Sequence, residues 1–328
     1  MNRRAAVAGW GHALPGTRVP NAHFEATLDT SDAWITERTG IQERRIASPE
    51  ETTATLATAA ARRILERSGS PATSIDLIIV ATATPEQPVP QTAAFVADAL
   101  GTHCGSLDLG AGCAGFVYGL VVGAASIAGG TFDRVLVVGA ETLSRIVDPD
   151  DRSTAILFGD AAAGVLLEAS DGPGFLAGDL GVDGSATGIL EVPAGGSRRP
   201  TSAATVAAGE HFVRMQGQEV FRRAVRAVVD SSEIALGRAG VASSEVDWFV
   251  PHQANLRIIE AARQRLGIPP ERTVVNIERY GNTSAASIPL ALAEAADAGR
   301  IRADDTLLLS GFGAGMSWAS AVLTWGRP

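Results

Sequence analysis

Lysine is absent from this sequence: all 27 basic residues of the 328-residue chain are arginines. Without lysine the chain cannot form a Schiff base with a carbonyl substrate or anchor a pyridoxal cofactor. It also cannot build a Walker-type phosphate loop, which needs a lysine. Positive charge is scarce overall, and the net charge of −9 provides no general basic surface for a nucleic acid. The sequence therefore predicts no nucleic-acid partner and excludes several enzyme classes.

Cysteine is also scarce, with only Cys104 and Cys113 present. Their spacing is not that of paired metal ligands, so we predict no metal site, and their small number indicates a reducing compartment, here the cytoplasm. Hydrophobic residues make up 46% and charged residues 19% of the chain, which suits a large core. Because no linker rich in proline, glycine or serine divides the sequence, we predict one compact body.

One charge-free stretch, residues 109–132, is long enough to cross a bilayer of ~20 helical residues. About half of it is glycine, alanine or serine, and it contains Cys113. A helix that is apolar on every side can equally lie at the centre of a folded core. The arginine pair at 3–4 resembles the start of a signal peptide, but His12 and Pro15 interrupt the apolar run that follows. We therefore predict a buried helix and no membrane association.

Cys113 is the strongest candidate for a catalytic side chain. It follows the strand-like residues 106–109 and precedes the apolar run, which places a thiol at a strand-to-helix turn. Unpaired backbone N–H groups and the helix dipole at such a turn favour an anion, so the thiol should lose its proton more easily. The small residues around it leave room for a substrate. A buried structural cysteine is the alternative, and this segment alone does not decide between them.

His252 and Asn282 provide the decisive context. His252 closes an apolar strand, and Asn282 stands where another helix opens. A cysteine, a histidine and an asparagine brought together in space form a nucleophile with its acid/base and orienting partners. Taken singly, His252 suits a hydrogen-bonded core position and Asn282 suits a helix cap. The combination is far more specific than any one residue.

The chain also repeats itself with a constant shift of 171 residues. Three pairs share this shift: Asp76 with Asp247, Asp133 with Asp304, and Cys113 with Ser284. Chance similarity of helix–Asp–strand patterns is the alternative. Duplication of an α/β unit predicts two stacked, helix-covered mixed or parallel sheets that bury the two alanine- and glycine-rich helices between them. The predicted halves are residues 1–171, with the cysteine, and 172–328, with the histidine and asparagine.

Several motifs point to a known family. They include Thr-Ser-Asp-Ala-Trp-Ile at 30–35, Arg-Thr-Gly-Ile at 38–41, Gly-Cys-Ala-Gly-Phe at 112–116, Phe-Gly-Asp-Ala at 158–161, Val-Pro-Ala-Gly-Gly-Ser-Arg at 192–198, His-Gln-Ala-Asn-Leu-Arg at 252–257, Gly-Asn-Thr-Ser-Ala-Ala at 281–286 and Gly-Phe-Gly-Ala-Gly at 311–315. Over essentially its whole length the chain closely resembles the β-ketoacyl-acyl-carrier-protein synthase III family. The resemblance implies an α/β thiolase fold with a duplicated five-layer αβαβα architecture, and a cytoplasmic homodimer.

The same resemblance implies a reaction. Cys113 would take the acyl group from an acyl-CoA, with the N–H groups of Cys113 and Ala314 as the oxyanion hole. Malonyl-acyl carrier protein would then lose carbon dioxide while His252 and Asn282 hydrogen-bond its thioester carbonyl, and the carbanion would attack the acyl-cysteine. Coenzyme A enters as a thioester substrate, and no cofactor is implied. No cysteine follows Cys113, which argues against a degradative thiolase.

The resemblance also implies binding residues. For coenzyme A they are Thr30, Trp34, Arg38, Arg152 and Asn255. For the acidic carrier protein they are Gln253, Ala254, Asn255, Leu256, Arg257, Arg222 and Arg265. For the acyl pocket they are Val89, Phe158, Leu190 and Met215. Without the family, Trp34 would be a partly buried core aromatic and the arginines would be ordinary surface charges.

The sequence leaves the starter acyl group open. Val89 stands where some relatives carry a bulky aromatic residue, in a loop (84–91) that would close the partner's pocket across the dimer. The smaller side chain predicts acceptance of chains longer or more branched than acetyl, unless Met215 or Leu190 fills the space. Initiation of fatty-acid synthesis is the predicted role. An enzyme of secondary metabolism with the same three residues is the alternative, and a catalytically dead scaffold is disfavoured because all three are intact.

Overall fold

The computed structural model describes residues 3–326 and contains two similar mixed sheets. The strands of the first sheet are β1 (Arg4–Ala13), β4 (Leu77–Ala81), β5 (Gly105–Leu109), β6 (Arg134–Glu141) and β7 (Ala161–Ser170). Those of the second are β8 (Gly174–Val182), β11 (Trp248–Pro251), β12 (Thr306–Gly313) and β13 (Ser317–Thr324). Their orders are β1-β7-β6-β4-β5 and β11-β12-β13-β8.

The two sheets repeat one topology. In the first, β4 runs parallel to β6, which is antiparallel to β7, and β7 is antiparallel to β1. In the second, β11 runs parallel to β12, which is antiparallel to β13, and β13 is antiparallel to β8. The predicted duplication is therefore present in the structure.

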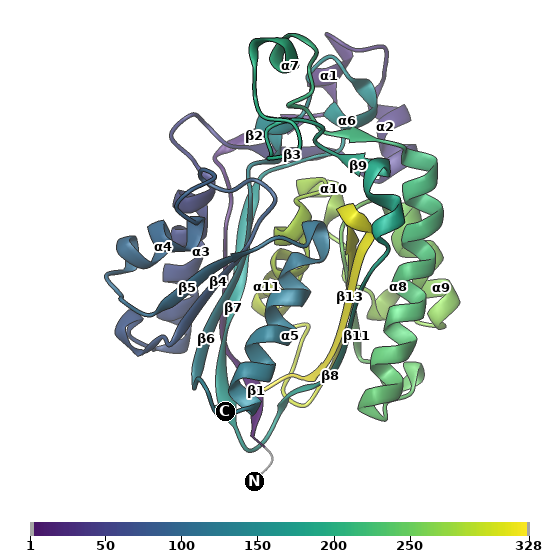
Figure 1. Ribbon diagram of the computed structural model, residues 1–328. Helices are drawn as coiled ribbons and strands as arrows, with labels where there is room; N and C mark the ends of the chain where they lie inside the picture. The colour runs from purple at the N-terminus through teal and green to yellow at the C-terminus, as the bar shows by residue number, and fades with distance from the viewer. Residues whose placement is uncertain (1–2, 327–328) are drawn as a thin grey trace.

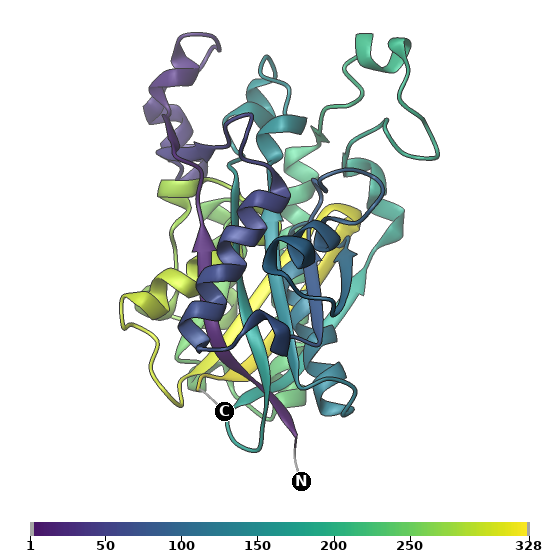
Figure 2. The same cartoon turned by 90° about the vertical axis from the view of Figure 1, so that its left-hand side faces the viewer.

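Helices form three layers around the two sheets (Figure 1). The central layer holds α5 (Gly115–Ala128) and α11 (Ser287–Asp297). The outer layers hold α3 (Thr53–Ser68) and α4 (Thr92–Leu100) on the first sheet, and α8 (Gly217–Ala239) and α9 (Leu256–Leu266) on the second. Figure 2 shows α3 lying along the outside of the first sheet next to β1. The predicted five-layer arrangement is confirmed.

The core between the sheets explains the composition of the central helices. Phe116 and Leu120 of α5 and Ile288 of α11 are fully buried in one cluster with residues of both sheets. Each buried side chain of this size stabilises the fold by about 1.5–3 kcal/mol. Small residues let α5 approach closely, because a Cβ at Gly119 would lie 2.9 Å from Val137 Cγ1.

The charge-free stretch contains a helix of 14 residues, α5, most of which is buried, although Val122 lies on an exposed side. Within residues 3–326, no helix has both the length and the apolar composition needed to cross a membrane.

Shorter elements gather at the end of the molecule drawn uppermost in Figure 1. They include two small antiparallel pairs and five short helices: β2 (Thr17–Pro20), β3 (Glu43–Ile46), β9 (Leu190–Glu191), β10 (Arg214–Met215), α1 (Ala22–Glu25), α2 (Asp32–Thr39), α6 (Arg152–Ala155), α7 (Ala203–Ala207) and α10 (Ile277–Tyr280). Single 3₁₀ turns of the chain are η1 (Ala72–Ser74), η2 (Gly112–Ala114), η3 (Leu143–Ile146), η4 (Gly184–Ile189), η5 (Ser243–Glu245), η6 (Pro270–Arg272), η7 (Ser284–Ala286) and η8 (Ala314–Met316).

Candidate active site

Three predicted catalytic residues line one cavity of about 150 Å³. Cys113 lies in η2 directly before α5, His252 follows the end of β11, and Asn282 precedes η7. Cys113 and Asn282 stand before the corresponding central helices α5 and α11 of the two halves, and His252 stands at the end of a strand beside them. The fold thereby brings together residues that are 139 and 30 positions apart in sequence. The convergence is what the Cys–His–Asn prediction requires.

Cys113 is nearly enclosed, with 9% of its surface exposed. Burial raises the pKa of its thiol to about 12, although a hydrogen bond with the Ser284 side chain acts in the opposite direction. Burial in this structure therefore acts against the easy ionisation that the turn predicts, because desolvation disfavours the thiolate. The attacking thiol therefore needs a group that takes its proton.

His252 is buried and uncharged. Burial lowers the pKa of its imidazole to about 3. Its Nδ1 lies 2.6 Å from Ser287 Oγ, and that oxygen also accepts a 3.3 Å hydrogen bond from the Gln253 backbone N–H. A hydroxyl that accepts from Gln253 has its own proton free for Nδ1, which favours the tautomer with its proton on Nε2. His252 is thus arranged as a neutral hydrogen-bond donor.

Asn282 is held by its neighbours on both sides. Its backbone N–H donates to Leu157 O at 2.9 Å, and its backbone oxygen accepts from Gly159 at 3.0 Å. Its side-chain Oδ1 accepts a 2.9 Å hydrogen bond from the Ser284 backbone N–H. Because the oxygen is occupied, the amide NH₂ is the end of this side chain available to donate to a substrate.

Two glycines bring the backbone of η8 against the cysteine. A Cβ at Gly313 would lie 2.4 Å from the Cys113 nitrogen, and a Cβ at Gly112 would lie 2.9 Å from the Ala314 nitrogen. The amide groups of Cys113 and Ala314 can therefore lie side by side only because neither glycine carries a side chain. This packing supports the predicted oxyanion hole, which stays a prediction.

The cavity wall is mainly apolar. Of the predicted pocket residues, Phe158, Leu190 and Met215 line it, and the last two face each other across the β9–β10 pair. Val220, Phe221 and Phe312 line it as well, and sequence reasoning missed them. The Phe312 ring lies 5.4 Å from the His252 ring, in an edge-on arrangement.

Comparisons with known proteins identify the family of this chain. A family model described as 3-oxoacyl-[acyl-carrier-protein (ACP)] synthase III matches residues 107–184, and its C-terminal counterpart matches residues 236–325. A β-ketoacyl-[acyl-carrier-protein] synthase III of Symbiobacterium thermophilum is 48% identical over 99% of this chain and 99% of its own. The chain belongs to the synthase III family. The predictions of family, thiolase fold and condensing acyltransferase are confirmed.

Solved structures show how closely the synthase III architecture is kept. The β-ketoacyl-[acyl carrier protein] synthase III of Thermus thermophilus is 45% identical, with a TM-score of 0.91, and the match covers 98% of this chain and 100% of that one. A priming β-ketosynthase from a polyketide biosynthetic pathway is 37% identical, with a TM-score of 0.92, and the match covers 100% of this chain and 98% of that one. The architecture is therefore shared both with a synthase III and with a relative whose name places it in a polyketide pathway.

The predicted coenzyme A residues of this synthase III chain form a cluster beside the cavity. The guanidinium groups of Arg38 and Arg152 lie 5.5 Å and 4.9 Å from the centre of the Trp34 ring. Asn255, which lines the cavity, donates a 3.0 Å hydrogen bond to Arg38 O and so links the cluster to the cavity mouth. Thr30 Oγ1 is buried and has no hydrogen-bond partner among the described residues. This arrangement is compatible with the predicted binding, which stays a prediction.

One member of the predicted carrier-protein set, Gln253, has a buried side chain. Gln253 is 1% exposed, and its side chain bonds Pro251 O, Val274 O and the Asn276 N–H inside the protein. Its side chain is therefore turned away from the surface, and carrier-protein binding by this segment stays a prediction. Its role is to fix the segment that carries His252.

The remaining residues of that set differ in availability. Ala254 and Leu256 are partly buried, whereas Arg257 and Arg265 are exposed on α9. Neither arginine forms an ion pair with a residue of the described chain. Arg222 on α8 is also exposed but pairs with Glu219 at 2.8 Å. The α9 arginines are therefore the better candidates for an acidic partner.

Val89 lies apart from this cavity. It is 81% exposed and lines a different hollow of about 380 Å³ together with Asp108 and Gly110. Because Val89 was predicted to close the pocket of a partner subunit, its position in one chain leaves that prediction untested.

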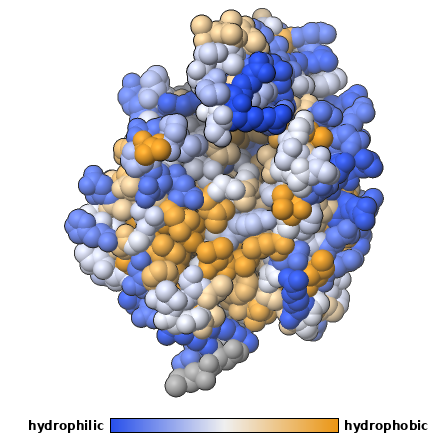
Figure 3. Space-filling view, viewed as in Figure 1, coloured by the Kyte–Doolittle hydropathy of each residue, from blue (hydrophilic) through white to orange (hydrophobic). Residues whose placement is uncertain are grey.

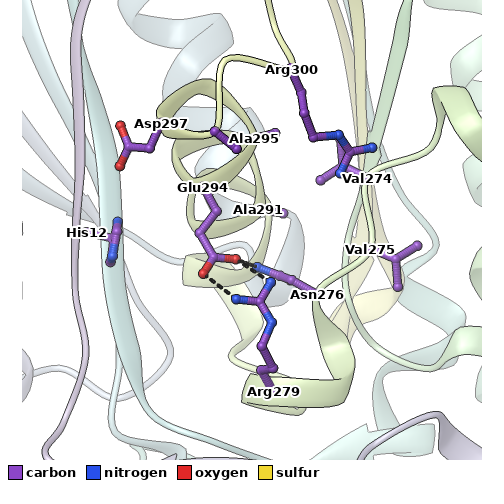
Figure 4. A pocket seen from close by; sticks show the side chains of 11 residues that line it. His12, Val274, Val275, Asn276, Arg279, Ala291, Glu294, Ala295, Asp297 and Arg300 are labelled. Atoms are coloured by element: carbon purple, nitrogen blue, oxygen red, sulfur yellow. Dashed lines mark hydrogen bonds and ion pairs between the residues drawn. The ribbon is translucent and has the colours of Figure 1, made fainter.

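Another cavity, of about 470 Å³, lies beside α11 (Figure 4). Several charged side chains line it, and two of them pair with each other: Glu294 accepts hydrogen bonds from Arg279 and also from the amide of Asn276, at 2.8 Å each. It contains none of the proposed catalytic residues. In residues 3–326, no group of three or more His, Cys, Asp or Glu side chains is arranged to hold a metal ion.

Sequence reasoning also missed three polar residues behind the site. Ser287 orients His252, and η7, which carries Ser284, packs against both η2 with Cys113 and the end of β6 with the buried Glu141. Ser284 had one signal in the sequence, since it is the counterpart of Cys113 under the 171-residue shift.

Proposed function

We propose that this chain joins the acyl group of a short or branched acyl-CoA to malonyl-acyl carrier protein, releasing carbon dioxide and coenzyme A. The convergence of the Cys113, His252 and Asn282 side chains on one apolar cavity carries this proposal. Membership of the synthase III family supplies the reaction class. No cofactor takes part, and coenzyme A acts as the substrate's carrier.

In the first half of the reaction, Cys113 attacks the thioester of acyl-CoA. The negative charge that develops on the carbonyl oxygen is stabilised by the N–H groups of Cys113 and Ala314. Support comes from the close backbone packing at Gly112 and Gly313. Coenzyme A then leaves, and the acyl group stays on Cys113.

In the second half, malonyl-acyl carrier protein enters and loses carbon dioxide. Nε2–H of His252 and the amide of Asn282 donate hydrogen bonds to the thioester oxygen as enolate character develops there. A neutral His252 suits this role, because its low pKa keeps the imidazole uncharged. The carbanion then attacks the acyl-Cys113 carbonyl and forms the 3-oxoacyl product.

The volume of the cavity indicates which size of starter acyl group it can hold. An apolar cavity of about 150 Å³ in another protein holds a benzene molecule, and the present cavity has about the same volume. It therefore has room for about six carbon atoms, more than acetyl requires. This supports acceptance of starters longer than acetyl.

Surface features support the two substrate sites. Trp34, Arg38 and Arg152 offer an aromatic face and two guanidinium groups to an adenine and its phosphates. The exposed Arg257 and Arg265, two helical turns apart on α9, offer positive charge to an acidic carrier protein.

The chain is further proposed to act as a cytoplasmic homodimer. β5 is an outer strand with one unpaired edge, which a second copy of β5 can satisfy across a two-fold axis. Figure 3 shows apolar surface gathered over the middle of this face. Exposed apolar residues on its elements are Phe95, Leu107, Val122, Leu180 and Val182. Val89 lies in a hollow next to the end of β5, which suits its proposed insertion into the partner.

Both cysteines are free, as a reducing compartment requires.

A priming role in polyketide synthesis is the second candidate. The observation in its favour is the 37% identical priming β-ketosynthase, whose TM-score of 0.92 is within 0.01 of that of the Thermus thermophilus synthase III. The two roles share every catalytic residue and differ in starter and carrier protein.

The test is incubation with a panel of acyl-CoAs and malonyl-acyl carrier protein, followed by intact-protein mass spectrometry. We expect acyl transfer to Cys113, none to Cys113→Ala, and a 3-oxoacyl carrier-protein product. Acylation of Cys113→Ala at full stoichiometry contradicts the assigned nucleophile. Condensation on a polyketide carrier protein but not on a fatty-acid carrier protein identifies the second candidate.

A further inference from the structure

Behind the nucleophile lies a chain of three side chains that the reaction described above does not use. Ser284 lies between Cys113 and Glu141, because its turn η7 packs against both η2, which carries Cys113, and β6, which ends at Glu141. The neighbouring Ala285 N–H donates to Glu141 Oε1 at 3.5 Å, and the Ser284 hydroxyl is within hydrogen-bonding reach of both the thiol and the carboxylate. A carboxylate only accepts, so Ser284 donates to Glu141 and its oxygen remains free to accept from the thiol. Ser284 has a φ of 48°, a left-handed conformation that a serine adopts at a cost of about 1–3 kcal/mol. The structure holds this side chain in place despite that cost.

Glu141 is a fully buried carboxylate, 0% exposed, at the end of β6. Its oxygens accept hydrogen bonds from the Thr84 hydroxyl at 2.7 Å, the Thr84 N–H at 3.1 Å and the Ala83 N–H at 3.1 Å. The Thr82 hydroxyl donates a longer bond of 3.3 Å. Donors of this kind stabilise the ionised form.

No arginine or histidine of residues 3–326 forms an ion pair with Glu141. The ionisable group that faces it is Cys113: the charge of the carboxylate and the burial of the thiol both raise the thiol's pKa. Burial also raises the pKa of Glu141 itself. Cys113 and Glu141 therefore titrate as a coupled pair in an environment that excludes water. Because two negative charges would repel each other there, the pair is more stable with one proton bound than with both groups ionised.

Acylation requires a group to accept the thiol proton. His252 is poorly suited, because its pKa of about 3 makes the imidazole a weak base, and its hydrogen-bonding places a proton on the nitrogen that faces the substrate. A buried carboxylate that is linked to the thiol through the Ser284 hydroxyl, and whose pKa is raised by burial, is better matched.

We propose that Glu141, acting through Ser284, stores the proton of Cys113 for as long as the cysteine carries an acyl group. This inference rests on the proposed acyl-Cys113 intermediate. As sulfur bonds to the acyl carbon, the thiol proton passes to Ser284 Oγ and the Ser284 proton passes to Glu141. The bond from the acyl carbon to the coenzyme A sulfur breaks, and coenzyme A takes a proton from solvent.

The proton returns in the second half of the reaction. When the carbanion attacks, the carbon–sulfur bond to Cys113 breaks and the sulfur leaves with the electron pair. Glu141 gives its proton to Ser284, and Ser284 gives its own to the sulfur. Over the whole cycle one proton from solvent appears on coenzyme A, and Glu141 is unchanged.

The test compares Glu141→Gln with the wild-type chain in two assays. The first is the single-turnover rate of Cys113 acylation by mass spectrometry, and the second is the pH dependence of Cys113 alkylation by iodoacetamide. Loss of the proton acceptor should slow acylation about 100-fold. Loss of the neighbouring negative charge should shift the alkylation profile to lower pH, because the thiolate becomes easier to form. A role in folding alone does not produce these opposite effects.

Asp160→Asn is the matched control. Asp160 is another fully buried carboxylate, hydrogen-bonded to the Ala47 N–H at 2.8 Å and the Ser144 N–H at 2.9 Å, away from the thiol. Its replacement should leave the alkylation profile at the wild-type pH. If Glu141→Gln does not fold, Ser284→Ala carries the test: it breaks the connection, keeps the charge, and should slow acylation by a similar factor without moving the alkylation profile to lower pH.

Two results would overturn the proposal. One is acylation of Cys113 at the wild-type rate in the Glu141→Gln or the Ser284→Ala variant. The other is slow acylation in Glu141→Gln with an alkylation profile unmoved, as in the Asp160→Asn control. Failure of the wild-type chain to acylate with any acyl-CoA is a different outcome, which refutes the proposed function and leaves the alkylation comparison valid.

Discussion

Replacing Gly313 with alanine offers a sharp test of the oxyanion hole. An ideal Cβ at this position lies 2.4 Å from the Cys113 nitrogen and 3.2 Å from the Cys113 Cα. Gly313 has a φ of −161°, which is extended backbone that alanine also adopts. The cost of the substitution is therefore the contact alone, without backbone strain at residue 313.

The size of the effect follows from that distance. Ordinary van der Waals contact needs about 3.4 Å, so the Cys113 and Gly313 backbones must separate by about 1 Å. Forcing an extra methyl group into packed structure costs roughly 1–3 kcal/mol of stability, which the fold can tolerate. Loss of one oxyanion donor lowers turnover by about 100- to 1,000-fold. We expect a folded protein with a large catalytic loss.

The assay is the single-turnover rate of Cys113 acylation, with thermal melting to show that the variant is folded. Gly110→Ala is the matched control, because it lies in the same loop as Cys113 and its added Cβ meets no atom within 4 Å. It should acylate at the wild-type rate. A folded Gly313→Ala variant that also acylates at the wild-type rate refutes the assignment of these amides as the oxyanion hole.

Four further predictions follow from the same geometry. His252→Ala and Asn282→Ala should slow decarboxylative condensation much more than acylation, as partial-reaction assays would show; equal losses in both steps would contradict the assigned roles. Since burial lowers the pKa of His252 from 6.5 to about 3, the unfolded chain binds this proton more readily, and stability falls as pH drops below about 6.5. The melting temperature of His252→Gln should therefore decrease less between about pH 7 and about pH 5 than that of the wild-type chain, and parallel decreases would count against a buried, neutral imidazole. Val89→Phe should narrow the starter range toward acetyl in a competition between acyl-CoAs, whereas strict acetyl preference in both proteins would defeat the idea. Arg257→Glu and Arg265→Glu should raise KM for malonyl-acyl carrier protein and leave KM for acyl-CoA unchanged; an unaltered KM for the carrier protein would remove α9 from the docking surface.

The identity of the nucleophile and of its partners could be predicted from the sequence because their chemistry is rare in this chain. With two cysteines and no lysine, few covalent mechanisms remained, and the motifs around Cys113, His252 and Asn282 matched one family. The duplication was also visible, because helix–Asp–strand units recur at a constant shift. Together these features determined the five layers and the three side chains that meet between them.

The protonation states were decided only by the tertiary structure. Sequence position placed Cys113 at a helix start, where its pKa should fall, but enclosure by both halves raises that pKa instead. Desolvation depends on every neighbour that excludes water, and no local pattern reports those neighbours. The same enclosure makes His252 a neutral donor, with Ser287 setting its tautomer.

Burial likewise decided which side chains of the 252–257 motif are accessible to a substrate or carrier protein. Gln253 and Asn255 are two positions apart in one motif, yet Gln253 turns inward to bond three backbone groups, while Asn255 caps α9 and lines the cavity. Glu141 gave no signal in the sequence, because a carboxylate after an apolar strand is common at surfaces. Only the packing of β6 against η7 places it behind the nucleophile, buried and without an ion-pair partner in residues 3–326. The sequence by itself determined which groups can react, whereas the three-dimensional exclusion of water determined where their protons reside.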